Sequence, residues 1–368
     1  NHFNFVPDNR ETSFGTLEEV KKFKVYFDGQ EKDLFRTFFG ALDITRQLGK
    51  NTSLSLLASA FYTKEQETYD IQGQYWLDDV NQNTNIAVGT YLEHARNYLT
   101  GHVENVKMLL RHKTRKHESE GALEIKFENV KERATEYEMR DSSGYSIPHT
   151  PDRLDLIYSL RSVNEMRSRR LEGYIMDTYR FQSNAERPSY YTLNYGLRFN
   201  HWSFNRETTV SPRASLSIVP SFDDNATIRL AAGLYYQAPF YKDVRDTTTV
   251  NGTTIATLNK NIKSQQSIQF VAGFDYRFKM LGRAFKFSAE AYYKHLSNLI
   301  PYNINNVKVT YYGENIADGY ATGLDMKLYG EFVPETGSWV TLSLMKTKQN
   351  IAGVSVPLPT DQRWGINV

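Results

Sequence analysis

The sequence predicts an all-β fold, an antiparallel up-and-down transmembrane β-barrel, on three observations. Apolar and polar residues alternate at every second position along many segments, which is the period of a β-strand. The apolar positions are rich in aromatic residues, in a chain with 25 tyrosines and 21 phenylalanines. Short and long connections between the segments also alternate, as they do when successive strands form a meander.

The alternation is clearest in four segments between Ser211 and Tyr293. Their apolar residues lie at 214–218, 228–236, 268–278 and 285–293. The intervening positions are polar or small and carry charges such as Arg213 and Glu290. A soluble sandwich would bury the apolar face within the protein, whereas a large membrane barrel turns it to lipid and lines its lumen with the polar face.

Weaker alternation predicts further strands on both sides of this stretch. In chain order, the segments before it lie at 34–44, 54–62, 86–92, 106–110, 123–127, 154–160, 171–181 and 191–199. The segments after it lie at 324–332 and 340–344, and a last strand begins near Arg363. Residues 1–30 are predicted to be loop with one candidate strand, and 141–153 to be loop. These segments give about 16 strand candidates and no long amphipathic helix.

The lengths of the connections decide between a membrane barrel and a soluble sandwich. Short connections are Pro220–Asn225, Met280–Arg283 and Pro334–Gly337. Long connections are Pro239–Ser264, Ser297–Asp318 and Asn350–Thr360. Because alternate connections of a meander fall at the same end, this is the pattern of short periplasmic turns and longer extracellular loops. A Greek-key sandwich has no reason to sort its loops in this way.

The composition excludes several other classes. Hydrophobic residues make up 40% of the chain, the mean hydropathy is -0.56, and no run of about 18 apolar residues predicts a transmembrane helix. The net charge of +2 gives no nucleic-acid signal, and the basic cluster Arg161–Arg170 is interpreted as a charged lumen or strand end. The chain has no cysteine, so disulfides and Cys-based metal sites are excluded.

Several strings resemble the barrel of TonB-dependent outer-membrane receptors. They are Ser211-Pro212-Arg213, the run from Gly233 to Pro239 and the run from Gly313 to Asp325. Three more resemble the Bacteroidetes branch of that family, namely the runs 62–67, 69–75 and 358–363. The resemblance extends along most of the chain from about residue 50.

The resemblance implies a barrel of about 22 strands with an N-terminal plug in its lumen. It also implies a TonB-box segment, which contacts the energy-transducing complex of the inner membrane. Neither part is recognisable in the sequence, and the chain ends within a strand. Residues 1–368 are therefore expected to be a partial outer-membrane barrel domain without the plug and the last strands.

The implied function is TonB-dependent active transport of a scarce nutrient across the bacterial outer membrane. The nutrient classes are siderophore, haem, cobalamin, oligosaccharide and peptide. The implied partners are outer-membrane lipid, the TonB complex and the protein's own plug, with a surface lipoprotein as a further candidate. A passive porin-like barrel, and a soluble secreted all-β glycan-binding protein, are the alternatives.

No catalytic residue, metal site or cofactor is expected. His112 and His117 lack the spacing of a zinc site, and Asp223-Asp224-Asn225 lacks the further ligands of a calcium loop. No Gly-x-Ser-x-Gly elbow occurs. The sequence thus favours transport without covalent chemistry, so the protein is not expected to be an enzyme.

Two groups of residues are the candidates for function. On the polar parity, the residues expected to line the lumen or hold the plug are Arg198, Arg213, Arg229, Arg277, Lys286, Glu290 and Asp325. In the long loops, the aromatic residues expected to contact a ligand are Phe240, Tyr241, Tyr302, Tyr311 and Tyr312. Loop packing, or a place in the interfacial girdle, is the alternative interpretation of the aromatic group.

Overall fold

The computed structural model describes residues 2–15, 20–82, 84–142, 154–280, 282–305, 308–333 and 335–368. In these residues every regular element is a β-strand, so the predicted all-β class is confirmed. No helix in the described ranges is long and apolar enough to cross a membrane. Most of the predicted loop 141–153 lies outside the described residues.

The first nine strands are β1 (His2–Gly15), β2 (Val20–Gln47), β3 (Thr52–Asp79), β4 (Thr84–Lys113), β5 (His117–Ser142), β6 (Asp155–Gln182), β7 (Tyr190–Trp202), β8 (Glu207–Val219) and β9 (Ala226–Gln237). The others are β10 (Arg245–Val250), β11 (Thr253–Leu258), β12 (Gln265–Met280), β13 (Arg283–Leu299), β14 (Tyr302–Asn305), β15 (Lys308–Tyr311), β16 (Ala317–Val333), β17 (Thr336–Ile351), β18 (Val354–Val356) and β19 (Trp364–Asn367).

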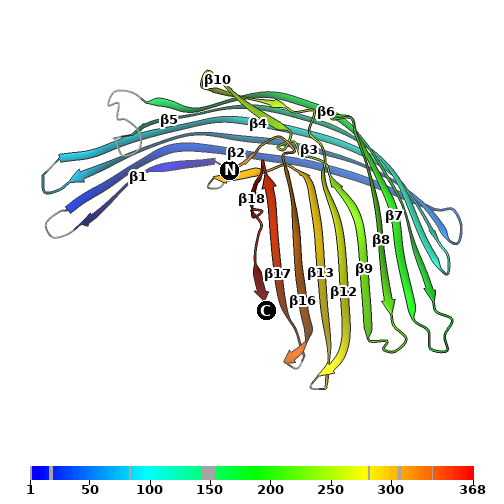
Figure 1. The fold of residues 1–368 in the computed structure, drawn as a ribbon. Helices are drawn as coiled ribbons and strands as arrows, with labels where there is room; N and C mark the ends of the chain where they lie inside the picture. Colours follow the sequence, from blue (N-terminus) through cyan, green and yellow to red (C-terminus); the bar gives the residue numbers. More distant parts are fainter. Residues whose placement is uncertain are drawn as a thin grey trace.

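The main sheet has 17 strands and is an antiparallel meander. Each strand from β2 to β9 pairs with its predecessor, and β12, β13, β16 and β17 continue the series after β9. Both β18 and β19 pair with β17. Among the described strands, β1 does not pair with β17, β18 or β19, so they form a strongly curved open sheet (Figure 1). The predicted up-and-down order is confirmed.

The sheet has one set of very long strands and one set of shorter strands. Strands β2 to β6 have 26 to 30 residues, whereas β7, β8 and β9 have 12 or 13. At about 3.3 Å per residue, a strand of 28 residues is about 90 Å long. Since a membrane needs only about 9–11 residues per strand, most of each long strand lies outside that thickness. Figure 1 shows these strands sweeping across the top of the shorter ones.

The sequence underestimated these long strands. Residues 1–30, predicted to be mostly loop, contain β1 and the first part of β2. The reason is visible in β3, where the parity of Leu56 and Tyr62 becomes polar from Lys64 onward although the pairing with β2 continues. Where both faces of a strand meet water, its hydrogen-bond ladder persists without an apolar period.

The register aligns the apolar positions of all strands from β2 to β17 on one face, which we call the apolar face. One row across the long strands is Leu42, Ala58, Val106, Ile125 and Leu171. One row across the shorter strands is Leu193, Leu216, Leu230, Ala272, Ala291 and Leu324. These side chains are not covered by the chain, since Leu42 is 61% exposed.

In the long strands the apolar face is confined to the end with the short turns. On β4 it runs through Leu110, Met108 and Val106 and stops at Glu104. The opposite end carries the hairpins β10–β11 and β14–β15, in two of the predicted long connections. The sorting by length is incomplete there, because only residues 203–206 join β7 to β8.

The β10–β11 hairpin covers an edge that the difference in strand length leaves open. Strand β7 ends at Trp202, opposite Arg170, so the edge of β6 is unpaired towards Asp155. There β11 pairs with β6 in parallel, with Ile255 opposite Arg161. An unpaired edge exposes backbone donors and acceptors, so this pairing protects β6.

Candidate functional site

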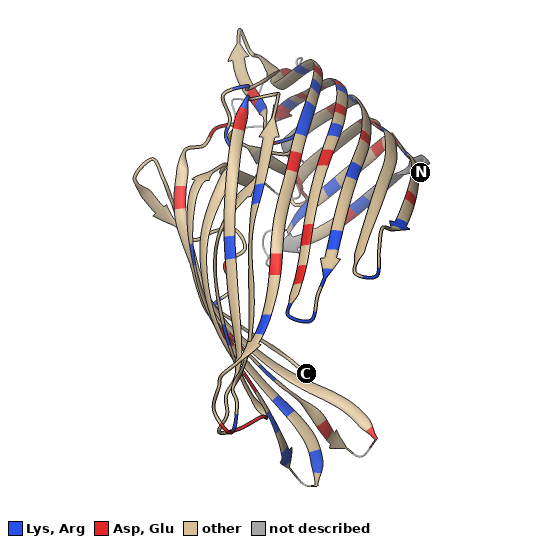
Figure 2. Ribbon diagram, turned by 90° about the vertical axis from the view of Figure 1, so that its right-hand side faces the viewer, with Lys and Arg blue, Asp and Glu red and all other residues tan. Residues whose placement is uncertain are grey.

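The charged residues predicted for the lumen lie on one face of the sheet, opposite the apolar face. The register links them across six neighbouring strands from β7 to β16. In one row Ser217, Arg229, Gly273, Glu290 and Asp325 lie side by side. Arg198, Arg213, Arg277 and Lys286 occupy the same parity on their strands. Figure 2 shows that charged residues occur along the lengths of the strands and not only at their turns.

Asp275 binds three neighbours on this polar face. Its carboxylate lies 3.0 Å from Nε of Arg229 and 3.5 Å from Nζ of Lys286. The Ser288 hydroxyl donates to it over 2.6 Å. A terminal nitrogen of Arg229 also lies 3.5 Å from Glu290. Sequence reasoning placed Asp275 on the polar parity but not at the centre of this cluster, since that position depends on the register.

A second cluster lines a cavity of about 180 Å³ on the polar face, between β6, β7 and β8. It contains Arg170, Arg198 and Arg213 together with Glu172. Glu172 is buried and accepts a hydrogen bond from Arg198. Two of the predicted lumen residues, Arg198 and Arg213, are thus brought together here, and Arg170 joins them.

The three arginines of this cavity differ in their partners. The Arg170 guanidinium lies 4.1 Å from the Trp202 ring centroid, and its Nε lies 3.0 Å from Glu128. Arg213 lies 4.1 Å over the Tyr235 ring and, within the described chain, has no carboxylate at ion-pair distance. The cavity therefore presents a cation that an anionic group can approach.

At the end with the long connections, the loops fold onto a small hydrophobic core. Met166 and Trp202 from the sheet pack with Val244, Ile262 and Ile300 from the loops. Met166 and Trp202 share the parity of Arg170, so this core lies on the polar side of the sheet. The connections after β9 and β13 are therefore held against the sheet.

Polar contacts fix the same loops. Glu132 on β5 accepts from the Ser162 hydroxyl over 2.6 Å and from the Tyr241 hydroxyl over 3.2 Å. Its carboxylate also lies 3.3 Å from Arg245 at the start of β10. Burial, together with the Glu132 charge, raises the pKa of the Tyr241 hydroxyl. Tyr241 is therefore a neutral hydrogen-bond donor at physiological pH.

The Gly313-Glu314-Asn315 string, which contributed to the family resemblance, joins two loops. The Asn315 side chain accepts from the Lys263 amide over 2.7 Å and donates to the carbonyls of Lys263 and Asn298 over 3.0 and 2.7 Å. Gly313 has a φ of +71°, and a Cβ there would lie 2.6 Å from the Arg245 carbonyl oxygen. Only glycine fits this approach of two backbones.

The predicted ligand aromatics fall into two structural groups. Tyr241 and Tyr311 pack against the loop core, and the Tyr311 ring lies 5.6 Å from that of Tyr302. Phe240 is 65% exposed and Tyr312 is 52% exposed. Packing thus accounts for Tyr241 and Tyr311, while Phe240 and Tyr312 present their rings to the outside.

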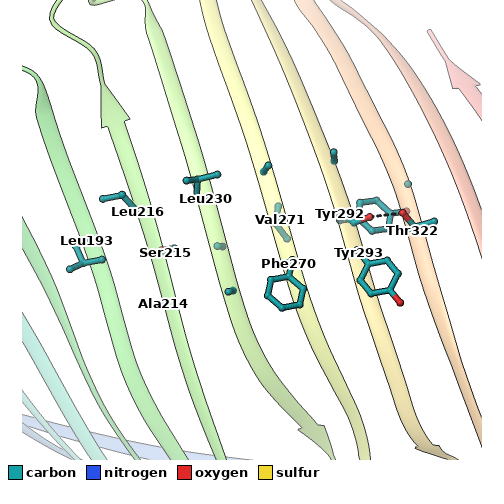
Figure 3. A pocket seen from close by; sticks show the side chains of 15 residues that line it. Leu193, Ala214, Ser215, Leu216, Leu230, Phe270, Val271, Tyr292, Tyr293 and Thr322 are labelled. Carbon is teal, nitrogen blue, oxygen red and sulfur yellow. Dashed lines mark hydrogen bonds between the residues drawn. The ribbon is translucent and has the colours of Figure 1, made fainter.

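A shallow depression of about 680 Å³ lies across β7 to β16 (Figure 3). Its apolar-face lining combines small residues such as Ala214 and Ala272 with the larger Leu230, Phe270 and Tyr293. The Thr322 hydroxyl donates to the Tyr292 carbonyl over 2.9 Å and is thereby satisfied. This surface offers apolar contact and few polar groups, so it suits hydrocarbon chains rather than a polar solute.

Comparison with known protein families gives one match that covers the whole chain. The family described as TonB dependent receptor-like, beta-barrel matches residues 1–368. No curated protein matches the chain in sequence.

Three solved structures are similar at low identity. The outer membrane transporter YddB from Escherichia coli has 9% identity and a TM-score of 0.49, covering 94% of this chain and 57% of that protein. The ferric yersiniabactin uptake receptor FyuA from Yersinia pestis has 10% identity and a TM-score of 0.47, covering 97% of this chain and 61% of that protein. The siderophore receptor PirA from Acinetobacter baumannii has 11% identity and a TM-score of 0.44, covering 97% of this chain and 64% of that protein. The chain spans less than two thirds of the length of each of these proteins.

Proposed function

Because the chain belongs to the TonB-dependent receptor family through its β-barrel, we propose that it serves the active uptake of a scarce nutrient. Receptors of this family lie in the bacterial outer membrane and are transporters, not enzymes. The observation that carries the proposal is the pairing of a continuous apolar face with a charged opposite face. A membrane barrel turns its apolar face to lipid and its polar face to an aqueous lumen.

In this proposal the polar face holds the plug that receptors of the family carry in the lumen. Arg213 and Arg277 support it, because neither has a carboxylate at ion-pair distance in the described chain. Charged groups facing a lumen gain partners when a polar domain fills it. The Asp275 cluster, by contrast, is already neutralised by Arg229 and Lys286 and would stiffen the wall.

The loops at the end opposite the short turns are proposed to meet the substrate. They are anchored by the core around Trp202 and expose Phe240 and Tyr312. Rigidly held loops with exposed aromatic rings are suited to binding, since little ordering is needed when a ligand arrives. The candidate substrates remain a siderophore, haem, cobalamin, an oligosaccharide or a peptide. The proposed partners are the TonB complex and, at the cell surface, a lipoprotein.

Growth of a deletion strain on iron complexes and on glycans tests this function. We expect loss of growth on one class of nutrient and its recovery with the full-length gene. Uptake of that nutrient should stop when a proton uncoupler de-energises the inner membrane. Uptake that continues in uncoupled cells would instead identify a passive pore. Release of the full-length protein without detergent would point to a soluble protein.

A further inference from the structure

A row of rings marks the limit of the apolar face on the long strands. Phe38, Tyr62 and His102 lie side by side in the register of β2, β3 and β4. Their ring centroids are 6.3 and 6.4 Å apart. Aromatic residues gather where a membrane protein crosses from hydrocarbon to headgroups. This row therefore lies at headgroup depth, on the side with the long connections, which is the outer leaflet.

Basic residues follow on β6 at this level and on β5 two positions beyond it. The register row continues from His102 through Asn129 to Arg167, and the row below it joins Phe127 to Arg169. The Arg167 side chain is 72% exposed and that of Lys131 is 57% exposed. The basic cluster 161–170 was interpreted as a charged lumen or strand end. Strand alternation instead turns Arg167 and Arg169 to the apolar face and only Arg170 to the polar face.

A cavity of about 360 Å³ lies at this place. Its lining includes His102, Phe127, Arg167, Arg169 and Ser203. The Ser203 hydroxyl accepts from the Arg169 amide over 2.8 Å, and the Ser203 amide donates to the Arg169 carbonyl over 2.9 Å. These bonds fix the turn after β7 beside the cavity.

The two arginines of the cavity differ in their partners. Glu165 is shared by Arg167, at 2.7 Å, and Lys131, at 3.4 Å. Arg169 lies 5.7 Å from the Phe127 ring and has no carboxylate at ion-pair distance in the described residues. The carboxylates in the lining belong to Glu104, which lies 3.6 Å from His102, and Glu128, which Ser168 and Arg170 hold. Arg169 is therefore the cation of the lining that an anionic group can approach.

We propose that this cavity binds the phosphate of an outer-leaflet lipid headgroup, with Arg167 and Arg169 as its donors. Guanidinium groups bind phosphate oxygens with paired hydrogen bonds. The apolar face continues directly below through Phe127, Ile125 and Leu171, all exposed, where acyl chains would pack. This continuity favours a lipid over a free anion. The inference rests on the outer-membrane location and not on uptake, so a failure of either can be recognised separately.

Native mass spectrometry of the full-length protein in detergent tests the site, with three probes. They are bisphosphorylated lipid A, the same lipid without its phosphates, and inorganic phosphate. We expect the wild type to bind the phosphorylated lipid more strongly than the dephosphorylated lipid or inorganic phosphate. The double variant Arg167→Ala/Arg169→Ala should bind it roughly tenfold to thirtyfold more weakly, since each cation near a headgroup contributes about fivefold.

Two further variants decide what a loss of binding means. Arg167→Lys/Arg169→Lys keeps the charge but loses the paired hydrogen bonds, so its binding should lie between that of the wild type and that of the double alanine variant. This intermediate value separates a loss of charge from misfolding. Arg115→Ala/Lys116→Ala removes an exposed basic pair from the turn at the opposite end and should change nothing. Equal binding of the dephosphorylated lipid, an equal loss in the Arg115 pair, or saturation by phosphate alone would each overturn the proposal.

Discussion

Arg229 on β9 lies with its Nε 3.0 Å from the carboxylate of Asp275 on β12, across two neighbouring strands of the sheet. The two residues are 46 positions apart, and the connection between their strands contains the β10–β11 hairpin. The contact therefore joins strands on either side of a long loop. Only 15% of the Asp275 side chain is exposed, so this ion pair is less screened than a surface pair.

Replacing Asp275 by asparagine should lower the free energy of unfolding by about 1–3 kcal/mol. The substitution removes the charge that Arg229 and Lys286 share, so Lys286 loses this ion pair and Arg229 keeps only the longer contact with Glu290. Urea unfolding of the full-length protein in liposomes measures the effect. Asp224→Asn is the control, because the Asp224 side chain is 70% exposed in a turn, and it should change stability by less than about 0.5 kcal/mol. Equal stability of the two variants would contradict the role of Asp275.

Asn315→Ala should loosen the loop before β12. The change removes the hydrogen bonds that join the Lys263 backbone to the loop after β13. Trypsin cleavage after Lys260 and Lys263 should become about tenfold faster, since the lost bonds are worth about 1–2 kcal/mol together. Asn303→Ala, at an exposed position on β14, is the matched control. Cleavage that stays at the wild-type rate would mean that Asn315 does not hold the loop.

The faces of the strands could be predicted from the sequence, because alternation is a local property. Ala272 and Phe274 face one way and Gly273 and Asp275 the other, whatever their partners. Pairing is not local. The predicted meander gives the order of the strands, but only the register decides that Asp275 meets Arg229 and Lys286.

The contacts of the loops could not be predicted from the sequence either. Asn164 on β6 donates to the Ala256 carbonyl on β11, 92 positions away. The segment around Ala256 gave no strand signal, because its pairing with β6 covers an edge that exists only where β7 ends early. The lengths of β2 to β6 were missed because their outer parts alternate without an apolar face.

The loop beside Asp243 should become less stable as the pH rises from about 4 towards neutrality. Asp243 is 2% exposed, and burial raises its pKa above the ordinary 3.8, although a hydrogen bond from the Phe240 amide opposes this shift. A raised carboxyl pKa means that the closed loop favours the protonated form. Its stabilising effect is present below the ordinary pKa and is lost as the pH passes the raised value.

Hydrogen exchange of residues 238–264 across this pH range measures that dependence. Burial, and after it the Asp243 charge, raise the pKa of the Tyr311 hydroxyl. Asp243→Asn removes the titrating group, so its exchange should change less with pH once the intrinsic chemical rate is subtracted. A wild-type loop whose corrected exchange does not vary with pH would contradict the effect of burial.

The two groups of loop aromatics should separate in function. Phe240→Ala and Tyr312→Ala remove exposed rings and should lower uptake of the nutrient about fivefold or more if those rings contact it. Stability should change by less than about 0.5 kcal/mol in either variant. Tyr241→Phe should instead affect the stability of the loop, because it removes the hydroxyl that donates to Glu132 and so loosens the loop. Uptake and hydrogen exchange measured on the same variants separate the two roles, and unchanged uptake in both alanine variants would remove Phe240 and Tyr312 from the substrate site.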